Sequence, residues 1–244
     1  MKKVISVFLC LALVLTAFAG CGKTETFKFG IATYTEITKQ TDAEGDTNGI
    51  GEASVTAAAV LLDSEGKIVN CAVDTVAPKA EYTAEGKAVK GADIKSKYEL
   101  KEAYGMAQST YDVNGDGTVK EWFEQADIFC NTVKGKTIDE VKKMVAEDMR
   151  GDAALQTAGC TIMVSELVKA LTNAAAKTTD VTAAKDTVLK LVPTVTAQTS
   201  DADAGVKGVA TFKVEFAVEA EGIEDAKASD EVKFEFDQKG IAAK

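Results

Sequence analysis

The sequence contains no histidine. Serine and cysteine nucleophiles are commonly activated by a neighbouring imidazole, so Ser–His and Cys–His catalysis are excluded. Zinc and copper sites built on imidazole ligands are excluded for the same reason. If the protein has a chemical activity, it must use something other than the common hydrolase chemistry.

A surplus of positive charge is also lacking. The chain has 28 Lys and Arg against 38 Asp and Glu, which gives a formal net charge of −10. Residues 1–20 carry two lysines and no acidic residue, so their removal would make the remaining chain more negative still. Such a chain is repelled by nucleic acid and by anionic lipid head groups. We therefore expect no nucleic-acid partner.

Cysteine is scarce, with five residues in the chain. After the N-terminal Cys21, only Cys71, Cys130 and Cys160 remain, an odd number with no close spacing. Disulfide-stapled secreted domains usually have an even number of cysteines at short intervals, so no disulfide framework is predicted. The hydrophobic content of 46% is enough for an ordinary core, in one large domain or two small ones.

The first twenty residues have the layout of a secretion signal. Lys2 and Lys3 precede an apolar stretch over residues 4–18, and small residues follow it. That stretch is short for a membrane span, and it ends as a cleaved signal does.

The end of this segment, Phe18-Ala19-Gly20-Cys21, resembles the lipobox of bacterial lipoproteins, with phenylalanine where leucine is usual. The resemblance implies cleavage before Cys21 and attachment of a diacylglycerol to its thiol. Two acyl chains anchor stably, because each buried methylene contributes about 0.8 kcal/mol. We therefore expect a lipid-anchored protein on the extracytoplasmic face of the cell membrane. The alternative is an ordinary secretory signal followed by a chance cysteine.

The pattern after the anchor predicts an α+β fold, in which antiparallel β-hairpins pack with helices. Residues 21–48 read as the anchor and a polar stem. Apolar runs over 53–62 and 68–73 flank an acidic turn that contains Gly66, which indicates a hairpin. A third strand is expected over 80–82. The α+β unit is assigned to 49–176.

Four segments have helical character. Apolar residues three and four apart predict helices, which we place over residues 94–104, 121–133, 137–149 and 161–176. Thr137 is the expected N-cap of the third helix, with acidic residues in its first turn.

Residues 177–244 resemble the opening of that unit and are expected to form a second, partial β repeat. Glycines precede a strand in both places, at Gly49 and Gly208, and acidic turns with glycine follow. An aromatic residue then precedes a glycine by four positions in both, from Tyr82 and from Phe236. Two unrelated hairpins could share such turns, which is the alternative.

A segment of small residues is the first candidate for chemistry. Ala158-Gly159-Cys160-Thr161 precedes the fourth expected helix, with Asp152 as the nearest acidic residue upstream. A hydroxyl at a helix N-terminus can hold a phosphate against free backbone amides. Small neighbours let the phosphate approach the backbone.

This segment resembles the flavinylation motif of FMN-binding-domain proteins, in which a threonine carries FMN through a phosphoester bond. The motifs Tyr104-Gly105-Met106, 121–125, 135–137 and 63–68 resemble the FMN-binding lipoproteins of Gram-positive bacteria. The resemblance implies covalent FMN at Thr161, with Trp122, Tyr104 and Met106 as neighbours of the flavin. It departs at Leu155, where the family has aspartate, at Ala158, where it has serine, and at Cys160.

An acidic loop is the second candidate site. Asp112, Asn114, Asp116 and Thr118 have the spacing of the first ligands of an EF-hand-like calcium loop, with Gly117 at the sixth place. The twelfth place, which should close the site with an acidic residue, is Phe123. A solvated turn is the alternative, because Asn-Gly and Asp-Gly favour turns.

These patterns lead to one functional expectation and two alternatives. We expect a membrane-anchored lipoprotein that carries FMN for extracellular electron transfer, with a flavin transferase and a membrane electron donor as partners. The first alternative is a binding or structural lipoprotein of the same fold that has lost the flavin. The second is a precursor whose signal segment, residues 13–20, is released as a peptide pheromone, as in some relatives of that family.

Overall fold

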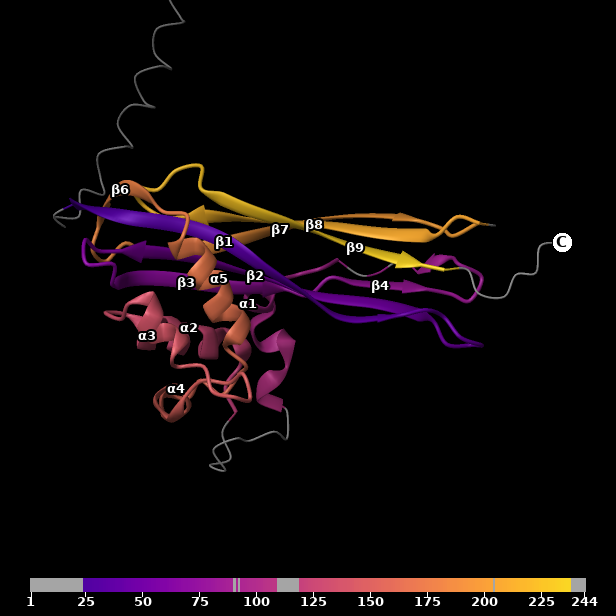
Figure 1. Cartoon of the computed structure of the whole chain (residues 1–244), viewed down its shortest axis with the longest axis horizontal. Helices are drawn as coiled ribbons and strands as arrows, with labels where there is room; N and C mark the ends of the chain where they lie inside the picture. Colours follow the sequence, from indigo (N-terminus) through magenta and orange to yellow (C-terminus); the bar gives the residue numbers. More distant parts are fainter. Residues whose placement is uncertain (1–23, 90, 92, 109–118, 204, 238–244) are drawn as a thin grey trace, which may run out of the picture.

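A computed structural model describes residues 24–89, 91, 93–108, 119–203 and 205–237 (Figure 1). Cys21 lies outside the described residues, and so does the expected calcium loop with Asp112, Asn114, Asp116 and Thr118. Within the described part of the chain, no helix is long and apolar enough to cross a membrane.

The larger of two antiparallel sheets is formed by the first six strands. They are β1 (Thr24–Thr41), β2 (Gly49–Leu62), β3 (Ile68–Val76), β4 (Lys79–Tyr82), β5 (Ala88–Val89) and β6 (Thr179–Ala184). The strand order is β5-β4-β2-β1-β6, and β3 pairs with β2 on the same side as β4. Strand β6 comes from the C-terminal third of the chain, so this sheet joins distant parts of the sequence.

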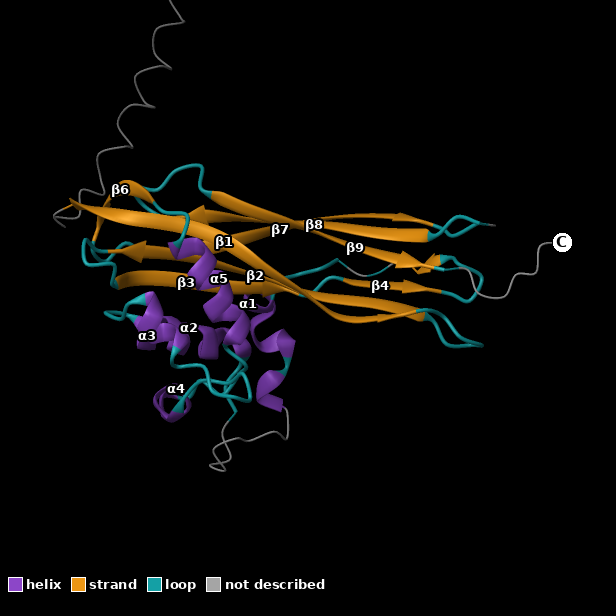
Figure 2. Cartoon of the chain, in the orientation of Figure 1, coloured by secondary structure: helices purple, strands orange, loops and turns teal. Residues whose placement is uncertain are grey.

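The smaller sheet contains β7 (Lys190–Ser200), β8 (Gly208–Glu219) and β9 (Lys227–Phe236) in sequence order. It lies against one face of the larger sheet, and the helices lie against the other face (Figure 2). The molecule therefore has three layers, with the larger sheet in the middle.

The helical layer is formed by short segments. The α-helices are α1 (Lys97–Leu100), α2 (Trp122–Val133), α3 (Ile138–Lys142), α4 (Ala153–Ala158) and α5 (Ser165–Ala175), and the 3₁₀ helices are η1 (Lys101–Tyr104) and η2 (Met106–Gln108). Helix α5 packs closely on β1 at Gly30, where an added Cβ would lie 2.0 Å from the carbonyl oxygen of Ala174. Only glycine allows this approach of helix and strand.

Strand β2 lies at the centre of the three layers. Ala58, Val60 and Leu62 face the helical core, whereas Ala57, Ala59 and Leu61 face the core between the sheets. A strand buried on both faces reads as a nearly continuous apolar run, which explains the absence of polar alternation in this segment. The small alanines leave room for the phenylalanines of β8 and β9, among them Phe212, Phe216 and Phe234.

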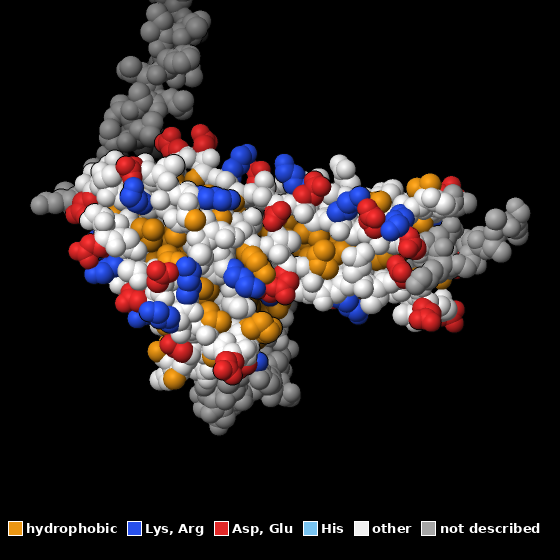
Figure 3. Space-filling model, viewed as in Figure 1, with side chains coloured by type: hydrophobic (Ala, Val, Ile, Leu, Met, Phe, Trp, Pro, Cys, Tyr) orange, Lys and Arg blue, Asp and Glu red, His pale blue; other side chains and the backbone are white. Residues whose placement is uncertain are grey.

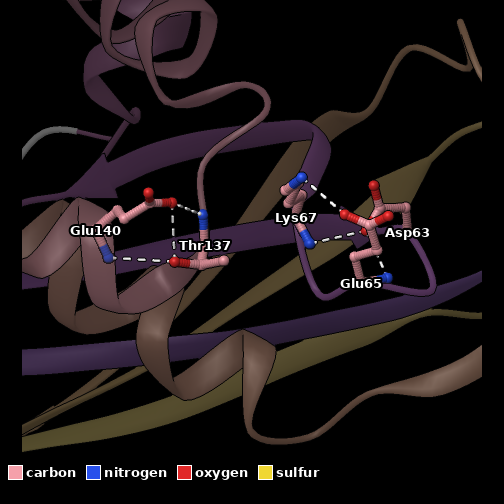
Figure 4. Close-up of polar contacts among 5 residues, drawn as sticks. All are labelled: Asp63, Glu65, Lys67, Thr137 and Glu140. Atoms are coloured by element: carbon pink, nitrogen blue, oxygen red, sulfur yellow. Dashed lines mark hydrogen bonds and ion pairs between the residues drawn. The ribbon is translucent and has the colours of Figure 1, made fainter.

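The turn between β2 and β3 lies beside the start of α3 (Figure 4), and Lys67 forms an antiparallel bridge with Thr137. Asp63 Oδ1 accepts hydrogen bonds from the backbone N–H groups of Glu65 and Lys67, each at 2.9 Å, which fixes the turn. Thr137 Oγ1 accepts from the N–H of Glu140, and the Glu140 carboxylate accepts from the N–H of Thr137, forming a capping box. The predicted N-cap at Thr137 is confirmed.

The two sheets also meet far from the helices, at the opposite end of the strands. The rings of Tyr82 and Phe236 stack with their centroids 4.3 Å apart. An added Cβ on Gly49 would meet the ring of Phe236 at 3.1 Å, and one on Gly208 would meet Tyr82 at 2.6 Å. The aromatic residue of each sheet therefore packs on the glycine that begins the central strand of the other.

Charged side chains of both signs are interspersed over the face shown in Figure 3. Surface ion pairs such as Lys79–Glu81 at 2.8 Å and Lys190–Glu219 at 2.7 Å are solvent-exposed. Pairs of this kind contribute roughly 0–1 kcal/mol each, so the stability of the fold rests on the two apolar cores.

The α+β class with antiparallel strands is confirmed, but the polar stem expected over residues 21–48 is wrong for the described residues. Thr24–Thr41 form the long strand β1, which pairs with both β2 and β6. Its N-terminal half buries Phe27 and Phe29, whereas its C-terminal half is largely exposed. The polar residues that suggested a stem belong to that exposed half and to the following turn.

Helix boundaries also differ from the expectations. The helix expected over 121–133 is confirmed as α2, but the one expected over 137–149 ends at Lys142. The chain then folds back, with Met149 at φ 67° and an antiparallel bridge between Val145 and Gly151. The one expected over 161–176 begins only at Ser165.

Candidate functional site

A pocket of about 450 Å³ opens in the helical layer, beside α2 and the start of α5. It is called the α2 pocket below. Its apolar lining is formed by Tyr104, Met106, Val119, Trp122, Ile162, Met163 and Leu167. Its polar lining is formed by Thr75, Lys97, Gln125, Arg150, Thr161 and Glu166. Volume and lining are those of a small-molecule site, in which apolar walls surround a few polar groups.

Gln125 connects two of the backbone segments around the α2 pocket by hydrogen bonds. Its side chain is 1% exposed, and its Oε1 accepts hydrogen bonds from the N–H of Thr161 at 2.7 Å and of Ile162 at 3.1 Å. Its Nε2 donates to the carbonyl of Lys120 at 2.8 Å. A buried amide with satisfied partners holds its neighbours in one geometry, so Gln125 fixes the segment of Thr161 against α2.

Glu121, which is 5% exposed, holds η2 beside the start of α2. Its carboxylate accepts from the backbone N–H groups of Met106 at 2.9 Å and Ala107 at 3.1 Å. These bonds attach η2 to the first residue before α2, and they set Met106 beside Trp122 in the lining.

The pocket carries positive groups at its rim. Lys97 Nζ lies 5.6 Å from the ring centroids of both Tyr104 and Trp122, within the range of a cation–π contact. Arg150 donates from Nη1 to the carbonyl of Thr161, and its Nε lies 3.6 Å from Asp148. Lys97 therefore lies next to two aromatic rings, and Arg150 lies next to the Thr161 backbone.

The carboxylate of Glu166 is the negatively charged group of the pocket lining. Glu166 Oε2 accepts from Ser54 Oγ at 2.5 Å and from Thr56 Oγ1 at 3.2 Å, two hydroxyls of β2. Thr56 Oγ1 also lies 2.9 Å from Thr75 Oγ1 on β3. This network ties the first turn of α5 to the middle sheet and leaves Glu166 in the pocket lining.

The structure brings four of the predicted flavin-site residues into one pocket: Thr161, Trp122, Tyr104 and Met106 all line it. The remaining predicted residues do not line it. Ala158 is exposed at the end of α4, and Gly159 is its left-handed C-cap at φ 98°. Asp152 caps the N-terminus of α4 by accepting from the N–H groups of Ala154 and Leu155.

Cys160 is fully buried, and burial raises the pKa of its thiol to about 12. Leu155, which stands in the place of the family's aspartate, is also fully buried in the helical core. Both residues therefore have packing roles.

The expected position of Thr161 at a helix N-terminus is wrong. Helix α4 ends before it, and α5 begins at Ser165 after the cap Val164. The N–H groups of Thr161 and Ile162 are bound to Gln125, so they are not available to a phosphate. The Thr161 hydroxyl is half-buried, 3.2 Å from Gln125 Oε1. Charge for a phosphate would come from side chains rather than from helix amides.

Sequence reasoning missed Gln125, Lys97, Arg150 and Glu166 as pocket residues. Gln125 could have been identified from the sequence, because it is a polar residue on the apolar face of α2, together with Trp122, Ala126 and Phe129. The other three are ordinary charged residues in the sequence, and only the chain reversals place them together. Among the described residues no cluster of acidic and cysteine ligands could hold a metal ion.

Comparisons with known protein families, curated proteins and solved structures find no match to this chain.

Proposed function

We propose that this chain is a membrane-anchored extracytoplasmic lipoprotein that binds FMN in the α2 pocket and acts as a carrier in extracellular electron transfer. Lipid attachment at Cys21 would hold the carrier near membrane donors. The proposal extends the sequence resemblance to the FMN-binding lipoproteins, in which residues 177–244 are a second, partial β repeat. When bound, FMN supplies one-electron and two-electron transfer.

The observation that carries the proposal is the convergence of Thr161, Trp122, Tyr104 and Met106 on one pocket. These residues come from three separate segments of the sequence, 104–106, Trp122 and Thr161. The aromatic and thioether side chains suit a planar ring, since rings stack well on aromatic groups.

Different residues of the chain would have different roles in holding FMN at this site. Lys97 and Arg150 would attract the phosphate, because cations favour a dianion in a partly enclosed site. Trp122 and Tyr104 would exclude water from the ring. Gln125 would keep the Thr161 segment in place, so that its hydroxyl faces the pocket.

The first test is titration of the purified protein with FMN, followed by flavin fluorescence. Loss of one charged contact costs about 1.5–3 kcal/mol, so Lys97→Met should weaken binding about tenfold or more. Lys95→Met, which changes an exposed lysine two residues away, is the matched control and should bind as the unaltered protein does. Absence of any saturable binding would overturn the proposal.

The second test concerns covalent attachment. The protein is co-expressed with a flavin transferase, and its mass is measured for the unaltered chain, Thr161→Ala and Thr157→Ala. Thr157 is an exposed threonine on α4 and serves as the control. We expect an adduct that only Thr161→Ala abolishes. Binding of FMN without an adduct would show a carrier that holds its flavin non-covalently.

Two observations favour the rival function, a binding lipoprotein that has lost the flavin. The backbone amides near Thr161 are bound to Gln125, and Leu155 fills the place of the family's aspartate. A colourless protein that neither binds FMN nor accepts it from the transferase would support the rival.

A further inference from the structure

Two cysteines that are far apart in the sequence meet in the helical core. Cys71 lies on β3 and is 5% exposed, and Cys130 lies on α2 and is 8% exposed. Cys71 Sγ lies 3.9 Å from the carbonyl oxygen of Cys130. The two thiols also share a hydrogen bond, which, with burial, raises the pKa of Cys130. The two sulfurs are therefore neighbours in the helical core.

A second pocket gives small molecules access to this pair. It has a volume of about 210 Å³ and is lined by both cysteines, Tyr98, Asp127 and the segment from Val188 to Leu191. Val188 is 73% exposed at its edge. A site open at one side admits a compact disulfide reagent, whereas the thiol of Cys160 lies elsewhere in the helical core and does not line this pocket.

We propose that Cys71 and Cys130 form an intramolecular disulfide when the protein is exposed to an oxidising disulfide outside the cell. The thiolate of one cysteine attacks the reagent R–S–S–R and releases R–S⁻. The second cysteine then attacks the mixed disulfide and releases a second R–S⁻. One S–S bond forms as one breaks, the two protein thiols are oxidised, and their two protons pass to the two R–S⁻ products.

The location of the chain makes this chemistry relevant. Structural disulfides persist in extracellular proteins, and residues 1–20 have the layout of a secretion signal. The bond is independent of any flavin, because it involves neither Thr161 nor the α2 pocket lining. Its consequence reaches that pocket, since α2 carries Trp122 and Gln125 as well as Cys130. The disulfide would tie α2 covalently to the middle sheet.

Peptide mapping tests the proposal directly. The full-length folded protein is incubated with a compact reagent, 2-hydroxyethyl disulfide, its remaining thiols are alkylated under denaturing conditions without reductant, and the digest is analysed by mass spectrometry. We expect a linked peptide pair that contains Cys71 and Cys130, together with alkylated Cys160. Separate alkylation of Cys71 and Cys130, or a link to Cys160, would overturn the proposal.

Thermal unfolding supplies a second readout, which compares the oxidised and reduced forms of each chain. Closing a long loop constrains the unfolded state, so reductant should lower the Tm of the oxidised protein by roughly 10 °C. Cys160→Ala should keep this difference, whereas Cys71→Ala/Cys130→Ala should lose it. An unchanged Tm of the oxidised protein after complete reduction would count against a stabilising bond.

Discussion

At the scale of single residues, the buried polar groups of this protein have identifiable partners. Gln125 satisfies two backbone N–H groups and one carbonyl, and Glu121 satisfies two N–H groups of η2. Among the described residues no buried side-chain nitrogen or oxygen lacks a hydrogen bond. Leaving one such group unsatisfied costs about 1–3 kcal/mol, so these residues determine where the loops around the α2 pocket lie.

Asp74 is the buried acidic residue whose pKa shift has the clearest consequence for stability. Asp74 is 2% exposed. Its Oδ1 accepts hydrogen bonds from the backbone N–H groups of Thr75 at 2.7 Å and Tyr98 at 3.1 Å. Burial raises the pKa of Asp74 to about 6 from 3.8, although a hydrogen bond from Ser96 and these two N–H groups oppose the shift.

Asp74 therefore makes the fold less stable as the pH rises. The native state binds the proton more tightly than the unfolded state, so the contribution is complete below pH 3.8 and is lost as the pH rises through 6. A shift of this size corresponds to about 3 kcal/mol in the free energy of unfolding.

We predict that Asp74→Asn removes this dependence. Asparagine stays neutral and keeps the acceptor oxygen, so its stability relative to the unaltered protein should increase between pH 4 and pH 7. Urea unfolding at several pH values measures the difference. The neighbouring Asp127, whose pKa burial also raises, is present in both proteins and cancels from the comparison. If the free energies of unfolding of the two proteins changed in parallel with pH, Asp74 would not be the source of this dependence.

At the scale of elements, local chemistry explains the starts of helices and the turns of hairpins. The capping box at Thr137 and the turn at Asp63 both use hydrogen bonds between residues at most four apart. The two elements meet through the N–H of Ile68, which donates to the carbonyl of Lys136 at 2.9 Å.

We predict that Thr137→Ala lowers the free energy of unfolding by about 1 kcal/mol, because the cap of α3 is lost. Thr157→Ala is the matched control, since Thr157 is an exposed threonine inside α4 with no capping role. Chemical denaturation of both variants gives the comparison. An equal and small effect of the two substitutions would show that the cap contributes nothing measurable.

Helix α5 shows where sequence reasoning at this scale stops. Residues 161–176 have helix-forming composition, yet residues 161–164 stay outside the helix. The N–H groups of Thr161 and Ile162 are bound by Gln125, and the N–H groups of Val164 and Ser165 donate to the carbonyl of Met149. These competing partners come from other segments, so local propensity could not reveal them.

At the scale of the whole molecule, the C-terminal third completes the core of the first part. Strand β6 pairs with β1, and the phenylalanines of β8 and β9 cover the alanine face of β2. The core between the sheets therefore contains Phe27 and Val55 from the first part and Phe216 and Phe234 from the last.

A chain shortened after Ala176 should therefore fail to fold cooperatively. It would expose the apolar face formed by β1 and β2, which monomeric soluble proteins rarely tolerate. We expect the full chain to unfold in one calorimetric transition and the shortened chain to show none. A cooperative transition in the shortened chain would instead establish residues up to 176 as an independent domain.

The sequence by itself determined the features that depend on neighbouring residues. The hairpin around Gly66, helix α2, the cap at Thr137 and the antiparallel α+β class all follow from short-range patterns of apolar, turn-forming and capping residues. The secretion signal is likewise a prediction from contiguous residues, because its positive, apolar and small segments adjoin one another.

Only the tertiary structure decided what distant residues do together. The residues Thr24–Thr41, expected to be a stem, form strand β1 because they pair with β2 and β6. It placed Thr161 beside Trp122 through Gln125, and Cys71 beside Cys130. The physical reason is that hydrogen bonds and apolar burial act between surfaces in space. Their partners are set by the packing of layers and not by spacing along the chain.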